Sequence, residues 1–174
     1  MIDESQAWGI AKFFARSVKK KLKSNLLALY TVGSLAEGDY IPGRSDIDTI
    51  LITKHSLPDC TKEKVEAMAA SFKTRYSIPK SIGSVIIEER LLRHPYGADI
   101  DLMPEILRLK LQGKVVVGGY NLEKVPMPFR KYMDCYKIPH LASCASHRQK
   151  ASGLKNCRSH NKHHSLRTQI QHLV

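Results

Sequence analysis

The stretch that decides the fold is GSLAEGDYIPGRSDIDTILI, residues 33–52. It begins where the apolar run LLALYTV (26–32) ends, and it leads through a polar segment into a second apolar run (47–53). Short apolar runs that are bounded by turn residues are typical of buried strands. We therefore expect two neighbouring strands, joined by one helical turn and a loop.

Asp46 and Asp48 flank Ile47 at the start of the second run. Side chains alternate between the two faces of a strand, so both carboxylates are expected on one face and Ile47 on the other. Two close like charges repel each other, and a divalent cation offsets them because Mg²⁺ prefers hard oxygen ligands. The pair predicts a magnesium site. The alternative is an ordinary polar turn, in which Ser, Asp, Pro and Gly are common.

Gly33 and Ser34 close the first strand. A glycine lets the backbone approach a ligand, and Ser34 offers a hydroxyl and an amide to a phosphate. Arg44 and Ser45 lie beside the acidic pair and are expected to contact the nucleotide, with Arg44 neutralising the leaving pyrophosphate. A phosphate cradle next to a metal-binding carboxylate pair is the arrangement that nucleotidyl transfer requires.

Helical and strand periodicity recurs along the first 120 residues. We expect helices over 4–23, 61–76 (with Thr61 as its N-cap) and 99–112, and further strands over 82–88 and 115–117. Because strand and helix patterns alternate, the fold class expected is α/β (α+β), with helices packed on a small β-sheet.

Charge divides the chain into two parts. The whole chain has 28 Lys+Arg and 16 Asp+Glu, a net charge of +12, and residues 124–174 hold 10 and 1 of these, or +9. Periodicity also fades after Pro126, where Ser, His, Lys, Arg and Asn dominate. We expect a folded domain over 1–125 and a basic, His-rich, partly disordered tail over 126–174.

The tail leaves two functional alternatives open beside that of a solubilising segment. Cys144, His147, Cys157 and His160 are residue types that bind zinc, but their spacing is not a common one. The positive charge would attract nucleic-acid phosphates, and because the tail has no interleaved aromatic residues for stacking after Tyr136, such binding would be weak and independent of sequence.

The cellular setting follows from what the chain lacks. No apolar run approaches the roughly 18–20 residues of a membrane span, and the N-terminus shows no basic-then-apolar leader. The four cysteines are irregularly placed, as expected of reduced thiols. We expect a cytoplasmic protein that does not bind membranes.

The order strand, Gly33-Ser34, loop, SDID (45–48), strand resembles the polymerase-β-like nucleotidyltransferase superfamily. It is most similar to the small members, the minimal nucleotidyltransferases and aminoglycoside adenylyltransferases. The motif covers 26–53, and a looser likeness continues to about residue 119. The resemblance implies a mixed sheet flanked by helices, ATP as donor and Mg²⁺ as cofactor. By position it makes Gly33 and Ser34 the phosphate-binding pair, and Asp46 and Asp48 the metal ligands.

One departure concerns a third acidic residue, which many members carry on the next strand. The closest position here is Ser84, and Glu88 lies four residues on, hence on the same strand face. We expect Glu88 to be the general base or a third ligand, with Asp99 and Asp101 as alternatives.

The predicted function is metal-dependent transfer of a nucleoside monophosphate, AMP from ATP, onto a hydroxyl of a protein or small-molecule acceptor. Full aminoglycoside enzymes carry a sizeable helical domain that a short basic tail does not replace, so a protein acceptor suits the chain better. The alternatives are an antitoxin-like binding module with weak or no catalysis, and a nucleotidyltransferase that acts on RNA ends through the basic tail.

Overall fold

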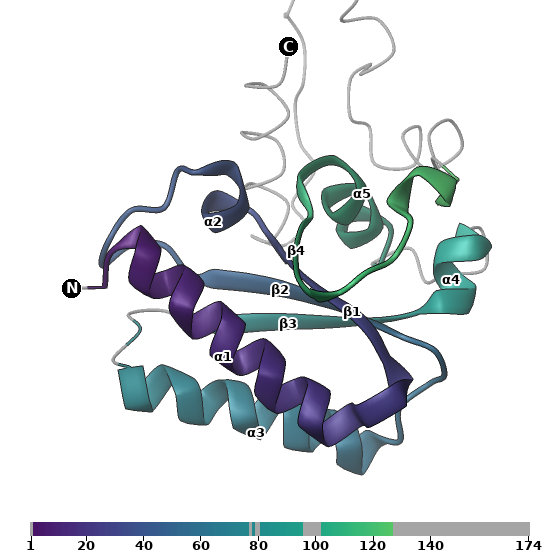
Figure 1. Cartoon of the computed structure of the whole chain (residues 1–174), viewed down its shortest axis with the longest axis horizontal. Helices are drawn as coiled ribbons and strands as arrows, with labels where there is room; N and C mark the ends of the chain where they lie inside the picture. The colour runs from purple at the N-terminus through teal and green to yellow at the C-terminus, as the bar shows by residue number, and fades with distance from the viewer. Residues whose placement is uncertain (1, 77, 79–80, 96–101, 127–174) are drawn as a thin grey trace, which may run out of the picture. The chain divides into compact units, whose positions relative to one another are not determined.

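The computed structural model describes residues 2–76, 78, 81–95 and 102–126 of the chain (Figure 1). The helices and strands are, in chain order, α1 (Glu4–Leu22), β1 (Leu26–Val32), α2 (Ser34–Glu37), β2 (Ile47–Thr53), α3 (Asp59–Tyr76), β3 (Ile82–Glu88), α4 (Glu89–Arg93), α5 (Met103–Gln112) and β4 (Lys114–Gly118).

The first helix, α1, is fixed at its start by a capping box. The Asp3 carboxylate accepts the Gln6 N–H at 2.8 Å, and the Gln6 side chain accepts the Asp3 N–H at 3.0 Å. These two bonds satisfy backbone donors that a helix start leaves without an internal partner. The buried side of the helix is formed by small and apolar side chains, which are Ala7, Ile10, Ala11, Phe14, Ala15, Val18 and Leu22.

Four strands form one mixed sheet in the order β3-β2-β1-β4. β1 pairs antiparallel with β2 and with β4, whereas β2 and β3 run parallel, with α3 in the connection between them. The register pairs Val32 with Asp48, which lays the end of β1 against the start of β2. The loop after β1 and the acidic pair therefore lie at one end of the sheet.

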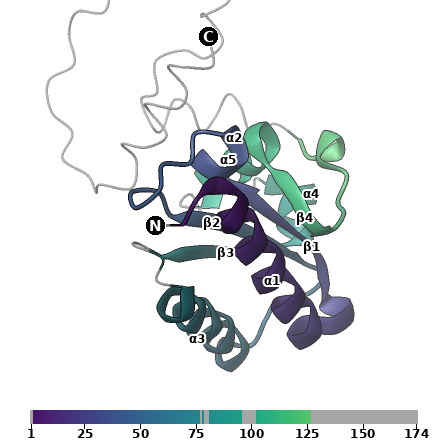
Figure 2. The ribbon, with the colours of Figure 1, turned by 60° about the vertical axis from the view of Figure 1, so that its left-hand side comes forward.

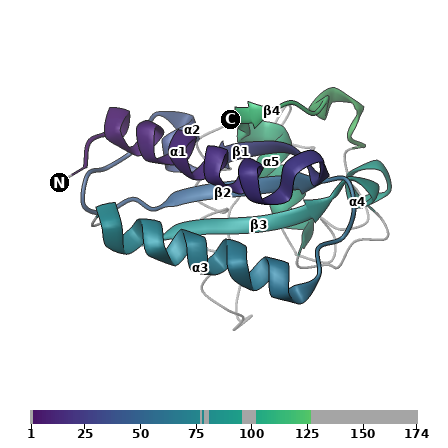
Figure 3. The same ribbon diagram turned by 60° about the horizontal axis from the view of Figure 1, so that its bottom comes forward.

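Helices cover both faces of this sheet. Figure 3 shows α1 and α3 on the near side of the strands and α5 behind them, and Figure 2 shows α2 and α5 at the same end of the sheet. We call the two sides the α1/α3 face and the α5 face. Ile47 and Leu51 of β2 belong to the core on the α1/α3 face. Asp48 and Ile50 alternate to the α5 face, where buried Met103, Ile106 and Leu109 pack from α5.

The structure confirms the predicted fold class, a small mixed β-sheet flanked by helices, and the positions of the four strands. Thr61 is not the cap of α3, because the helix begins at Asp59 and the Thr61 N–H donates to the carbonyl of Pro58 at 2.8 Å. The short helix α4 was not expected. The domain boundary and the tail over 126–174 stay predictions, since 127–174 lie outside the described residues.

Within the described part of the chain, no helix is both long enough and apolar enough to cross a membrane.

Candidate active site

The Gly33 turn joins β1 to α2. Gly33 adopts φ 69° and ψ −154°, a conformation that glycine reaches without strain. Its carbonyl accepts the N–H groups of Ala36 and Glu37 at 2.9 and 3.0 Å, which forms the single helical turn that the sequence predicts. Ser34 is half-buried at the start of this turn. The chain is thus folded tightly beside the end of β1.

A second set of bonds shapes the loop that leads to β2. The Ser45 hydroxyl accepts the Ile41 N–H at 2.9 Å, and the Ile41 carbonyl accepts the N–H groups of Arg44 and Ser45 at 3.1 and 2.9 Å. Ser45 therefore supports the loop directly, while the Arg44 side chain is exposed to solvent. Arg44 and Ser45, which were predicted to contact the nucleotide, thus lie next to the acidic pair.

Asp46 and Asp48 lie at the start of β2, on either side of the fully buried Ile47. Asp48 points to the α5 face, opposite to Ile47, as the alternation of a strand predicts. Asp46 precedes the first strand residue and lies near the buried hydroxyl of Tyr40. Burial, and next the negative charge of Asp46, raise the pKa of Tyr40 above its ordinary value.

Arg108 on α5 is a direct partner of Asp48, and sequence reasoning missed it. Its Nη2 lies 2.7 Å from Oδ2 of Asp48, and its Nη1 lies 3.1 Å from Oε2 of Glu105. The Arg108 side chain is only 13% exposed, and that of Asp48 is 29% exposed. Burial alone would lower the pKa of Arg108, but the charges of Asp48 and Glu105 outweigh burial and raise it. Arg108 is therefore held as a cation at the site.

The same helix also reaches the Gly33 turn. The Gln112 Oε1 accepts the Gly33 N–H at 3.3 Å. Glu105, Arg108 and Gln112 are separated by three and four residues, so they share one face of α5. That set of polar residues on one face of the helix was the only signal in the sequence that α5 borders the site.

Glu88 is not brought to the acidic pair, which corrects the expectation that it is a base or third ligand there. It pairs with Thr53, whereas Asp48 pairs with Gly83. Five strand positions separate Gly83 from Glu88, a distance of about 16 Å, and because five is odd the two point to opposite faces. Glu88 instead lies 3.4 Å from Arg90 as an ion pair at the far end of β3.

The α5 face of β3 carries no acidic side chain. The positions on this face beside Asp48 are Gly83, Val85 and Ile87, and Ser84 points to the opposite face. A Cβ built on Gly83 would lie 2.8 Å from Oδ1 of Asp48, so the Asp48 carboxylate occupies the space above the glycine. The alternatives that the sequence offered for a third carboxylate, at positions 99 and 101, fall outside the described residues.

The donor set suits Mg²⁺ that arrives with a nucleotide. Mg²⁺ in nucleotide-dependent enzymes is held by one or two carboxylates together with substrate phosphates and water. Asp46 and Asp48 provide two carboxylates next to a backbone turn, and residues 2–126, where described, contain no cluster of three or more His, Cys, Asp and Glu suited to a metal. The protein thus supplies part of a coordination sphere that phosphate oxygens would complete.

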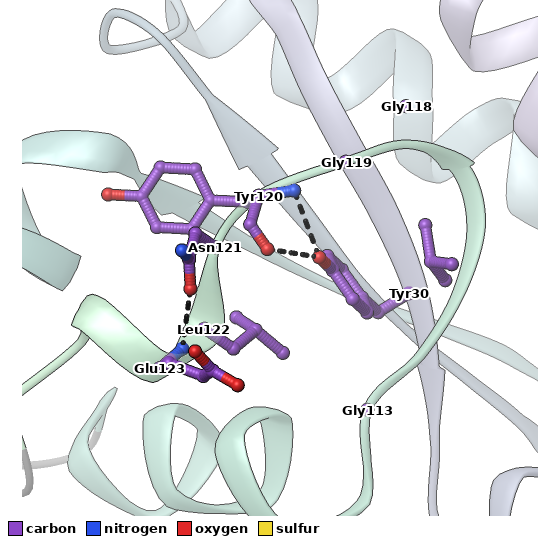
Figure 4. Close-up of a pocket in the computed structure, with 9 residues that line it drawn as sticks. Tyr30, Gly113, Gly118, Gly119, Tyr120, Asn121, Leu122 and Glu123 are labelled. Carbon is purple, nitrogen blue, oxygen red and sulfur yellow. Dashed lines mark hydrogen bonds between the residues drawn. The ribbon is translucent and has the colours of Figure 1, made fainter.

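A separate hollow of about 510 Å³ lies by the edge strand β4 (Figure 4). The Tyr30 hydroxyl donates to the Tyr120 carbonyl at 2.9 Å and accepts the Tyr120 N–H at 3.1 Å, which fixes the loop after β4. Residues of that loop line the hollow together with Tyr30, Gly113 and Val115. None of the site residues predicted from the sequence lines it.

Comparison with known proteins supports the assignment that the motif suggests. Residues 12–96 match the family described as the nucleotidyltransferase domain. No curated protein gives a significant match. Among solved structures, a spectinomycin adenyltransferase from Enterococcus faecialis, determined with ATP and spectinomycin, has 22% sequence identity and a TM-score of 0.54. That alignment covers 67% of this chain and 59% of the other, so this chain spans less than two thirds of that enzyme.

Two further solved structures are more distant. A toxin–antitoxin complex determined with AMP-PNP has 19% identity and a TM-score of 0.40, with 71% of this chain and 86% of the other covered. A protein from Shewanella oneidensis has 16% identity and a TM-score of 0.40, with 74% and 85% covered. The match to the nucleotidyltransferase domain supports the predicted resemblance to nucleotidyltransferases, and the structure of the spectinomycin adenyltransferase supports the predicted fold class.

Proposed function

We propose that this chain, whose residues 12–96 match the nucleotidyltransferase domain, transfers AMP from ATP to a hydroxyl group of an acceptor. The observation that carries the proposal is the pairing of Val32 with Asp48. It places the Gly33 turn directly beside the acidic pair, so a nucleotide held by one is next to the other. ATP is proposed as donor because the spectinomycin adenyltransferase of similar fold was determined with it.

In this proposal the chain positions groups and supplies charge. Gly33 and Ser34 hold the phosphates through backbone and hydroxyl donors, Asp46 and Asp48 hold Mg²⁺, and exposed Arg44 meets the pyrophosphate. Ser45 keeps the loop in shape through its bond to Ile41. The bound Mg²⁺ would neutralise phosphate charge and activate the acceptor hydroxyl.

The reaction itself is a displacement at the α-phosphorus of ATP. The acceptor oxygen forms a bond to that phosphorus, the bond to the bridging oxygen breaks, pyrophosphate leaves, and the hydroxyl proton is released to water. Because the site lies at a half-exposed end of the sheet, both the acceptor and the leaving group can reach it from solvent. Preorganised charge supplies most of the rate in such a mechanism.

The test follows label from ATP labelled in the α-phosphate, incubated with Mg²⁺ and cell lysate. We expect label on one acceptor class, protein, small molecule or RNA, and loss of about 100-fold or more in Asp46→Asn and Asp48→Asn. Asp59→Asn is the matched control, because that carboxylate is 89% exposed and, within the described part of the chain, pairs with Lys62 on α3. Unchanged transfer by both site variants would refute the mechanism.

A binding module with weak or no catalysis is the second candidate, and the composition of β3 favours it. Gly83, Val85 and Ile87 provide no third carboxylate beside Asp48, so the described site holds fewer metal ligands than the family pattern offers. This candidate predicts that the protein captures a partner without transferring label, whereas the enzyme predicts a labelled acceptor.

A further inference from the structure

The geometry of Arg108 is unusual for a side chain that only stabilises the fold. Two of its nitrogens are bonded to carboxylates, Nη2 to Asp48 and Nη1 to Glu105. Its third donor, Nε, is buried and has no acceptor among the described residues. A buried donor without a partner is costly, so its presence calls for an explanation, and an ion or another group that binds there is one.

The Arg108–Asp48 bond conflicts with metal binding. Oδ2 of Asp48 is occupied by the guanidinium, whose positive charge also repels a divalent cation at the same carboxylate. Mg²⁺ can therefore bind Oδ2 of Asp48 only if Arg108 gives up this hydrogen bond. A guanidinium that loses one carboxylate in a buried place needs another anion.

A nucleotide phosphate is the anion that fits. Gln112 lies four residues after Arg108 on α5 and contacts the Gly33 N–H, so the Gly33 turn lies about one helical turn, roughly 6 Å, along the helix from Arg108. A triphosphate held at this turn would come within reach of a long guanidinium side chain. Guanidinium groups bind phosphate through two parallel N–H donors, and Arg108 has Nε and Nη2 on one edge for this purpose.

We propose that Arg108 exchanges partners when the nucleotide binds, releasing Asp48 to Mg²⁺ and taking the triphosphate instead. This inference rests on the proposed function, because it assumes that ATP and Mg²⁺ meet at the acidic pair. Arg108 then has two opposite effects: it weakens metal binding in the absence of nucleotide, and it strengthens nucleotide binding in the presence of metal. A residue that serves only the fold would not have effects of opposite sign.

The experiment measures two affinities on the full chain. Mn²⁺ alone is titrated and the free ion is followed by electron paramagnetic resonance; α,β-methylene-ATP, which cannot release pyrophosphate, is then titrated in the presence of Mn²⁺ by calorimetry. For Arg108→Gln we expect Mn²⁺ alone to bind several-fold more tightly and the nucleotide to bind about 10-fold more weakly, as expected for one lost charge-assisted contact. Arg90→Gln, an exposed arginine paired with Glu88, is the matched control and should change neither affinity.

Glu105→Gln provides a second variant with the reverse prediction. Without the Glu105 charge, the Arg108 cation is less compensated and holds Asp48 more strongly. We expect weaker binding of Mn²⁺ alone and unchanged or tighter binding of the nucleotide. This variant keeps the inference testable if Arg108→Gln does not fold, which thermal unfolding of each variant will show.

The outcomes separate the inference from the proposed function. Wild-type protein that binds neither Mn²⁺ nor the nucleotide would overturn both. The second outcome is that the wild-type protein binds both, but Arg108→Gln or Glu105→Gln changes the two affinities in the same direction or not at all. That outcome would overturn the partner exchange and leave the proposed function standing.

Discussion

Replacing Gly83 by alanine tests how closely the Asp48 carboxylate is positioned. The new Cβ would lie 2.8 Å from Oδ1 of Asp48, and ordinary contact begins at 3.4 Å, so the carboxylate must move by about 0.6 Å. The backbone at Gly83 lies in a regular strand and its φ is not positive. The substitution therefore acts on one side chain and not on the strand.

We expect Gly83→Ala to change the free energy of unfolding little and to lower metal binding and transfer strongly. The obstructing atom is the end of a side chain that can rotate, and alanine restricts the unfolded chain more than glycine does, so we expect the free energy of unfolding to change by less than about 1 kcal/mol. A displacement of this size in a metal ligand can lower a transfer rate by roughly 10- to 100-fold. Mn²⁺ affinity should fall with it.

The assay compares urea unfolding, Mn²⁺ binding and label transfer for Gly83→Ala and for the control Gly119→Ala. A Cβ at Gly119 meets nothing within 4 Å, so that variant should behave as wild type in all three. Wild-type Mn²⁺ binding and transfer in Gly83→Ala would refute the view that Asp48 works from this position. A decrease of more than about 3 kcal/mol in the free energy of unfolding would refute the view that the Asp48 carboxylate can rotate away from the new Cβ.

Three further predictions concern one residue each of β4, α5 and α2. Gly118→Ala should lower the free energy of unfolding by about 2 kcal/mol or more, measured in urea, because φ is +71° and the Cβ would lie 2.0 Å from the Leu27 carbonyl, which as backbone cannot step aside. Lys110→Met should lower the free energy of unfolding by about 1–3 kcal/mol and speed amide hydrogen exchange over residues 119–126, because the Lys110 ammonium donates to the carbonyls of Leu122, Glu123 and Val125. Unchanged hydrogen exchange would contradict this prediction. Burial, and next the charge of Asp39, raise the pKa of Glu37, while the charge of Arg108 opposes them, so the contribution of Glu37 to the free energy of unfolding is present below pH 4.5 and is lost as pH rises through the raised pKa. Glu37→Gln should remove this part of the pH dependence, measured by urea titrations from about pH 4 to pH 7. A pH profile identical to that of the wild type would contradict the prediction.

The fold was largely readable from local patterns. The apolar runs at 26–32, 47–53 and 82–88 became strands with these bounds, because each is a short and mostly apolar segment. The two parts of the Gly-Ser and Asp-x-Asp motif also lie at one end of the sheet, as expected for parts of one strand–loop–strand unit. Such features depend on neighbours along the chain, which a sequence displays directly.

What the sequence did not reveal depends on register and on packing across the sheet. Glu88 was assigned from its distance to Ser84 along one strand, but the pairing of β3 with β2 shifts the relevant face by one residue and puts Gly83 opposite Asp48. A one-residue difference in register reverses every side chain, and no local pattern fixes it. Arg108 was missed for the same reason, because its contact with Asp48 spans 60 residues.

These two residues together explain why Asp48 has a defined position before any ligand binds. The glycine on β3 leaves the space that Oδ1 fills, and the arginine on α5 holds Oδ2. The first contact is steric and is unaffected by a nucleotide, whereas the second is electrostatic and can be replaced by a stronger competing charge. Asp48 can therefore change its partner without changing its place, which is the property that a ligand for an incoming cation needs. If Arg108 were instead a permanent partner of Oδ2, only Oδ1 of Asp48 would be left to a metal, and the proposed transfer would depend on that single oxygen together with Asp46.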